Sequence, residues 1–177
     1  MKKYINKSLN LFIMIFTIIF IISPNLFAFD KILHRGNGAE PDTLDPHLAT
    51  GHWEGSVIND IFIGLFTKGI EGESLKGSVD NYLVSDDGLI YTFYLRKDHF
   101  WSDGTNVTSL DYVNGLRRVL DPLTASQYGS LLYLIKNGFE VNSGSLSPEK
   151  LGVEALDEYT LRIYLNYPAP YFEELLT

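Results

Sequence analysis

The stretch 85–113, SDDGLIYTFYLRKDHFWSDGTNVTSLDYV, constrains the fold of this chain more than any other part of the sequence. It opens with the turn formers Ser85-Asp86-Asp87-Gly88, after which apolar and aromatic residues occupy every odd position from 89 to 95. That alternation predicts a half-buried β-strand. Thr108 then stands three residues before Asp111, the spacing of a capping box, so a helix is predicted to begin there.

The residues around this stretch extend the prediction. Tyr82 and Val84 are predicted to lie in a strand that forms a hairpin with 89–95, and the helix is expected to end at Asp121-Pro122. Its last-turn arginines, 117 and 118, favour a surface position near the negative helix end over an anion site. Trp101 is expected to be buried beside Phe100, with stacking on a ligand as the alternative.

The rest of the chain shows a mixture of helical and strand patterns. Residues 53–67 predict a helix whose apolar residues serve packing, and 68–75 predict a loop. Ser147-Pro148-Glu149 is expected to open a short helix. The segments 152–156 and 160–165 predict two strands around the turn at 157–159. These elements together favour a mixed α+β domain.

The first 28 residues have the pattern of a secretory signal peptide. Three lysines (2, 3 and 7) precede the apolar run 11–22, Ser23-Pro24 breaks it, and Ala28 offers a small residue for cleavage. An uncleaved membrane anchor is the alternative, but this run of twelve residues, one of them a Thr, is short against the roughly 20 that a spanning helix needs.

The sequence contains no cysteine, which excludes a lipid-anchored export signal, disulfides and thiolate metal sites. Without the three lysines of the predicted signal peptide, the 14 basic residues become 11 against 22 acidic ones, a net charge of −11. Such acidity argues against a nucleic acid partner. Asp42 and Asp45 adjoin prolines and fit turn chemistry better than a metal or acid/base site. The four histidines have no metal spacing, and no cofactor is expected.

Six segments in series resemble one family, the extracellular solute-binding proteins of oligopeptide transporters. In chain order they are AEPDTLDPH (39–47), GLF (64–66), the stretch 85–113, LTASQY (123–128), LGVEALDEYTLRIYL (151–165) and YPAPYFEELL (167–176).

The resemblance implies an α/β (mixed α+β) fold that is the N-terminal fragment of a bilobal periplasmic-binding-protein (type II) fold. It comprises part of lobe I plus a small extra domain, and the second lobe is missing. The expected boundaries are a signal peptide at 1–28, the N-terminal part of lobe I at 29–69, a small α+β domain at 70–165, and a return to lobe I at 166–177.

The function that the resemblance implies is periplasmic oligopeptide binding for an ABC transporter, with no enzymatic activity. The side chain of Tyr128 and the backbone of Thr50, Gly51 and His52 are the ligand contacts it implies. The expected partners are short peptides, the permease subunits and a separately encoded C-terminal half. The expected location is the periplasm, reached by a cleaved signal and without a lipid anchor.

Two alternatives stay open. A non-peptide ligand of the same family (nickel chelate, haem or sugar) would fit the same segments, because the lobe that selects the ligand is absent. A stand-alone exported interaction module would require residues 70–165 to fold by themselves without dependence on peptide. An enzyme is not favoured, since no Ser/His/Asp, paired-carboxylate or phosphate-loop arrangement stands out.

Overall fold

The computed structural model describes residues 32, 34 and 36–177. The chain divides into two units, Met1–Gly36 and Asn37–Thr177, and the second unit holds all the helices and strands described below. The predicted signal peptide, 1–28, lies outside the described residues. Among the helices in the described part, none is long and apolar enough to cross a membrane.

A four-stranded antiparallel sheet forms the centre of the second unit, in the order β3-β4-β6-β5. Its strands are β3 (Val79–Val84), β4 (Ile90–Leu95), β5 (Val153–Asp157) and β6 (Thr160–Tyr164). Both predicted hairpins are therefore confirmed. The β3–β4 turn closes with a hydrogen bond from the Gly88 N–H to the Ser85 carbonyl, 2.8 Å long.

Strand β4 is buried on one face, as its alternating sequence predicted. Tyr91, Phe93 and Leu95 are buried, whereas Tyr94 between them is exposed. The buried residues of β4 join those of β5 and β6 in one apolar core, which also contains buried residues from α3 and from the C-terminal segment.

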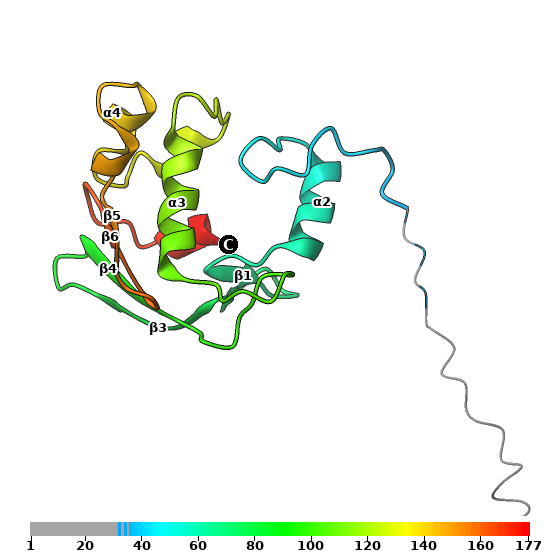
Figure 1. Cartoon of the computed structure of the whole chain (residues 1–177), viewed down its shortest axis with the longest axis horizontal. Coiled ribbons are helices and arrows are strands. Elements are labelled where there is room, and N and C mark those ends of the chain that lie inside the picture. Colours follow the sequence, from blue (N-terminus) through cyan, green and yellow to red (C-terminus); the bar gives the residue numbers. More distant parts are fainter. Residues whose placement is uncertain (1–31, 33, 35) are drawn as a thin grey trace, which may run out of the picture. The chain divides into compact units, whose positions relative to one another are not determined.

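Helix α3 (Ser109–Leu120) packs against β5 and β6 (Figure 1). The capping prediction is confirmed, because the Asp111 carboxylate accepts the Thr108 backbone N–H at 2.7 Å and the Thr108 hydroxyl at 2.8 Å. The helix ends at Leu120, directly before Asp121-Pro122. Its N-terminal Ser109 is also held by a hydrogen bond to the Asp157 carbonyl at the end of β5.

Short helical segments make up most of the remaining connections. They are η1 (Gly129–Leu132), α4 (Gly138–Asn142), η2 (Pro148–Lys150) and η3 (Phe172–Leu176). Of these, η2 is the short helix predicted to open at Ser147-Pro148-Glu149. After β6 the chain continues to η3, where Phe172 packs edge-on against Tyr91 of β4 with ring centroids 5.0 Å apart. In Figure 1 this C-terminal segment (red) lies between α3 and α2.

The predicted helix 53–67 is wrong in its second half. Helix α2 spans only His52–Ile61, and β1 (Phe66–Lys68) pairs with β2 (Ser74–Lys76), so the predicted loop 68–75 is part of a hairpin. The pairing of β1 with β2 gives the physical reason. Gly64 permits the close approach of the chain before β1, because a Cβ there would lie 2.8 Å from the backbone oxygens of Phe66 and Leu176.

The apolar face expected on this helix is only partly buried, with Val57 and Ile58 half-buried. The one buried residue of α2 is Glu54, whereas Trp53 and Ile61 are 43% and 58% exposed. The burial that the pattern suggested occurs in β1 and just before it, where Leu65 and Phe66 are buried.

Candidate functional site

Thr50 and Tyr128, two of the four predicted ligand contacts, meet in the structure. The Tyr128 hydroxyl donates a hydrogen bond to the Thr50 carbonyl over 3.3 Å. Tyr128 directly precedes η1 and follows a turn in which Ala125 has a φ of 52°. Both residues are exposed, so solvent reaches the phenol and the backbone next to it.

Gly51 and His52 form the start of α2. The Gly51 carbonyl accepts the N–H of Gly55 over 3.2 Å, so it is already engaged in the helix. The His52 ring lies edge-on to Trp53, with centroids 5.4 Å apart. A Cβ at position 51 would clash with Glu54 Oε2, so a side chain there would require the Glu54 carboxylate to move.

Glu54 is a structural residue of this segment that the sequence interpretation missed. It is only 5% exposed, and its Oε1 accepts the Asp42 N–H over 3.0 Å. The Asp42 N–H, followed by the N–H of Glu54 itself, lowers the pKa of the Glu54 carboxyl. An acid three residues after a helix N-cap is a recognisable local signal for capping, but the bond from Asp42 spans twelve residues and has no such local signal.

Arg118 of α3 binds the turn that precedes Thr50. Its Nη1 and Nη2 donate to Asp45 Oδ1 and Oδ2 over 2.8 and 2.5 Å, and Nη1 also lies 2.8 Å from His47 Nδ1. The hydrogen bond from Arg118, with the His47 backbone N–H, lowers the pKa of Asp45 to about 2. Arg118 lies exposed in the last turn of α3, as predicted, and its contact with the turn at 45–47 is an additional role that the sequence interpretation missed.

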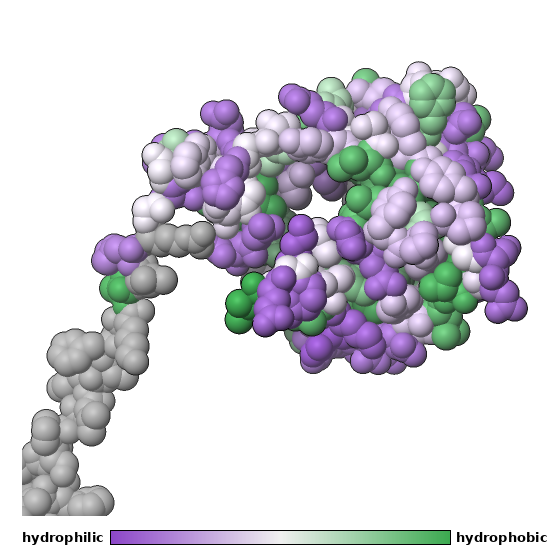
Figure 2. All heavy atoms as spheres, turned by 180° about the vertical axis from the view of Figure 1, so that it is seen from behind, coloured by the Kyte–Doolittle hydropathy of each residue, from purple (hydrophilic) through white to green (hydrophobic). Residues whose placement is uncertain are grey.

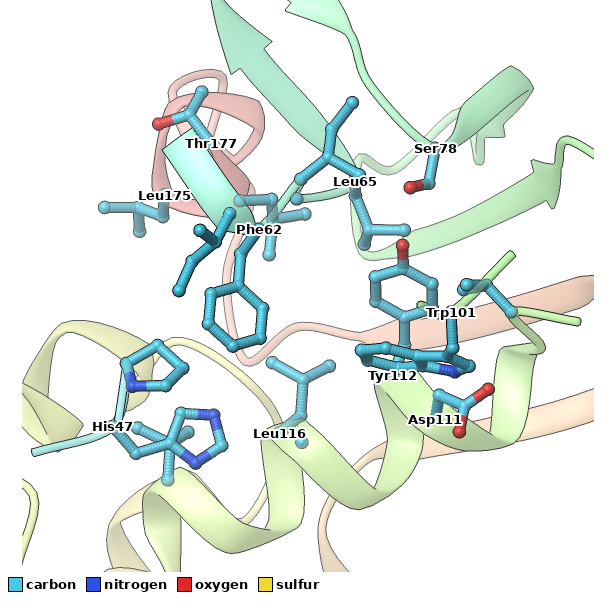
Figure 3. Close-up of a pocket in the computed structure, with 18 of the residues that line it drawn as sticks. His47, Phe62, Leu65, Ser78, Trp101, Asp111, Tyr112, Leu116, Leu175 and Thr177 are labelled. Atoms are coloured by element: carbon cyan, nitrogen blue, oxygen red, sulfur yellow. The ribbon is translucent and has the colours of Figure 1, made fainter. Parts of the chain in front are cut away.

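A hollow of about 890 Å³ opens between α2, α3 and the C-terminal residues. Its floor comes from one face of α3 (Tyr112, Leu116 and Val119), and its walls come from 61–65 and 175–177. Hydrophobic side chains flank an opening on the face shown in Figure 2. The Phe62 ring projects into the hollow toward Leu116 (Figure 3).

The expectation that Trp101 is buried beside Phe100 is wrong. Phe100 is 58% exposed and Trp101 is 42% exposed, and both line the hollow. They sit at the base of a small hairpin, in which Trp101 and Thr105 pair through their backbones at 2.8 Å. Figure 3 shows the Trp101 indole beside Tyr112 and Asp111.

The hollow and the predicted contacts occupy different places. None of Thr50, Gly51, His52 and Tyr128 lines the hollow, although His47 of the same segment does. We take the Thr50–Tyr128 contact as the candidate site, because there an accessible backbone and a phenol meet. In the part of the chain that the structure describes, no group of three or more His, Cys, Asp or Glu side chains could hold a metal.

Comparison with known proteins gives consistent matches. Residues 43–177 match the family model of the bacterial extracellular solute-binding proteins, family 5. The periplasmic oligopeptide-binding protein OppA of Escherichia coli K12 is 40% identical over 148 residues, which are 82% of this chain and 27% of that protein. This chain thus spans about a quarter of the length of that relative.

Solved structures give the same result. Listeria monocytogenes OppA bound to peptide superimposes with a TM-score of 0.76 at 36% identity, over 78% of this chain and 27% of that one. Haemophilus influenzae OppA in complex with RPPGFSPFR superimposes with a TM-score of 0.76 at 37% identity, over 80% of this chain and 28% of that one. The family match covers more than half of the chain, and the fold agrees with it. The chain belongs to the bacterial extracellular solute-binding proteins of family 5.

Proposed function

We propose that this chain is part of a periplasmic binding protein that captures short peptides and delivers them to the permease of an ABC transporter. The observation that carries the proposal is the contact between Tyr128 and Thr50, which the fold brings together from positions 78 residues apart. Tyr128 offers a hydrogen-bonding phenol and Thr50 an exposed backbone, and a peptide can use both. The peptide complexes of the Listeria and Haemophilus relatives support this ligand class.

Binding by this part alone is expected to be weak. Binding sites gain affinity by enclosing the ligand, so that its polar groups exchange water for protein partners in a closed cleft. The candidate site lies open on the surface, and this chain spans 27% of the length of the E. coli relative. We therefore propose that tight binding requires polypeptide equivalent to the other three quarters, in the same or in a separately encoded chain.

The finer features of the proposal concern export and organisation. We propose that residues 1–28 are a cleaved signal peptide and that the product is periplasmic and not a lipoprotein, which the absence of cysteine supports. The proposed division assigns 29–69 and 166–177 to lobe I and 70–165 to a small domain. All four strands of the central sheet, together with α3, lie within 70–165.

Thermal unfolding of the exported chain with and without trialanine tests this proposal. By itself the chain is expected to show no shift in Tm. When it is combined with the part of E. coli OppA outside the matched region, the Tm should rise with trialanine concentration, because a ligand that binds only the folded state stabilises it. Substituting Tyr128→Phe should reduce that rise.

Two results would contradict the proposal. A trialanine-dependent rise in Tm for the chain alone would show that it needs no further polypeptide. Consumption of trialanine, followed by mass spectrometry, would place the protein among enzymes instead of binding proteins.

A further inference from the structure

The segment from Asp42 to His52, which holds three of the proposed ligand contacts, is held by side chains from distant parts of the sequence. Arg118, in the last turn of α3, reaches a partner 73 residues earlier, and Tyr128 reaches one 78 residues earlier. The location of the segment on the unit therefore depends on α3 and the loop that follows it.

The contact between Arg118 and Asp45 has the geometry of a strong ion pair. Two parallel N–H···O bonds join the guanidinium to both carboxylate oxygens, at 2.8 and 2.5 Å. Such bidentate pairs fix orientation as well as distance. The Asp45 carbonyl in turn accepts the N–H groups of Leu48 at 3.1 Å and Ala49 at 3.0 Å. Arg118 thus holds the turn that runs directly into Thr50.

His47 is a second side chain of the turn that contacts Arg118. An arginine has only donors, so His47 Nδ1, 2.8 Å from Arg118 Nη1, must be the acceptor, with the ring neutral and its proton on Nε2. The His47 backbone N–H also donates to Asp45 Oδ1 over 3.0 Å. One guanidinium therefore holds two side chains of one turn.

We propose that Arg118 is the positioning residue for the ligand-contact segment Thr50–His52. By fixing the turn at 45–49, it sets where the backbone of Thr50 lies relative to the Tyr128 phenol. That the segment contacts ligand rests on the proposed function. That Arg118 holds the segment is a property of the ligand-free chain and can be tested separately.

Hydrogen exchange of the 177-residue chain tests the holding role. In Arg118→Gln, the amides of Leu48 and Ala49 should exchange at least about tenfold faster, because the turn opens locally. The amide of Phe93 in β4 should keep its wild-type rate. Arg118→Lys, which keeps the charge but lacks the planar fork, should give an intermediate rate.

A matched variant controls for the loss of a charge. Arg162→Gln removes the guanidinium that lies 3.8 Å from Glu154 on the sheet, and it should leave Leu48 and Ala49 unchanged. Wild-type exchange at these two amides in Arg118→Gln would overturn the proposal. Equal acceleration at Phe93 would also overturn it, because that result would mean general destabilisation.

The affinity for trialanine tests the consequence for binding. It is measured with this chain combined with the part of E. coli OppA outside the matched region. Arg118→Gln should weaken binding at least about tenfold, and Arg162→Gln should not. Faster exchange with unchanged affinity would overturn the positioning role. Failure of the wild type to bind trialanine would overturn the proposed function, while the exchange result would still decide whether Arg118 holds the segment.

Discussion

The contact between His47 and Arg118 exists only while the imidazole is neutral, which makes it sensitive to acid. Burial of the ring lowers the pKa of His47, Arg118 lowers it further, and Asp45 acts in the opposite direction. In the unfolded chain the pKa of a histidine is about 6.5. Because the folded state binds fewer protons, the stabilisation due to His47 is complete above that pH and is lost as the pH falls through the folded-state pKa.

This predicts that His47→Gln makes the protein less sensitive to mild acid. Glutamine keeps an acceptor for Arg118 but does not titrate. Urea unfolding at pH 7.5 and pH 5 should show a larger loss of unfolding free energy for the wild type than for the variant. Asp45, with a pKa of about 2, stays ionised at both pH values and does not disturb the comparison. Equal losses would show that His47 is not the titrating group.

At the scale of elements, the Asp111 carboxylate caps the start of α3. Asp111 accepts both the backbone N–H and the hydroxyl of Thr108. Asp111→Ala should lower the free energy of unfolding by about 1 kcal/mol, the usual cost of losing a helix cap. Glu140→Ala, in the first turn of α4, removes an acid near a helix N-terminus and serves as the control. Similar losses in both variants would indicate a helix-dipole effect instead of capping.

The elements that were predictable are those specified by nearby residues. The alternation of apolar residues predicted β4, and the turn at Ser85–Gly88 predicted its hairpin partner β3. The spacing of Thr108 and Asp111 predicted the start of α3. The error at 53–67 arose because Ile61 and Leu65 fit a helical period, whereas the tertiary contacts of Gly64 and the pairing of β1 with β2 decide the structure. The contact of Arg118 with Asp45 spans 73 residues and leaves no local pattern.

At the scale of the whole molecule, the hollow between α2, α3 and the C-terminal residues is an apolar surface. Phe62, Phe100 and Trp101 line it, and charged groups are few among its lining residues. Large exposed apolar surfaces mark protein or membrane interaction sites or ligand-binding grooves. The chain spans 27% of the E. coli relative, so the polypeptide equivalent to the rest of that protein is the occupant we expect.

Two phenylalanines allow a matched test of this expectation. Phe100 lines the hollow and Phe139 lies on α4 away from it, and both are 58% exposed. Phe100→Asp should weaken association with the remaining part of E. coli OppA at least about tenfold, because a carboxylate buried in an apolar contact loses its hydration. Phe139→Asp should leave association unchanged. Titration calorimetry measures the affinity of each variant for the remaining part of E. coli OppA. Equal weakening by both substitutions would show that this polypeptide does not occupy the hollow, and so would a lack of association by the wild type.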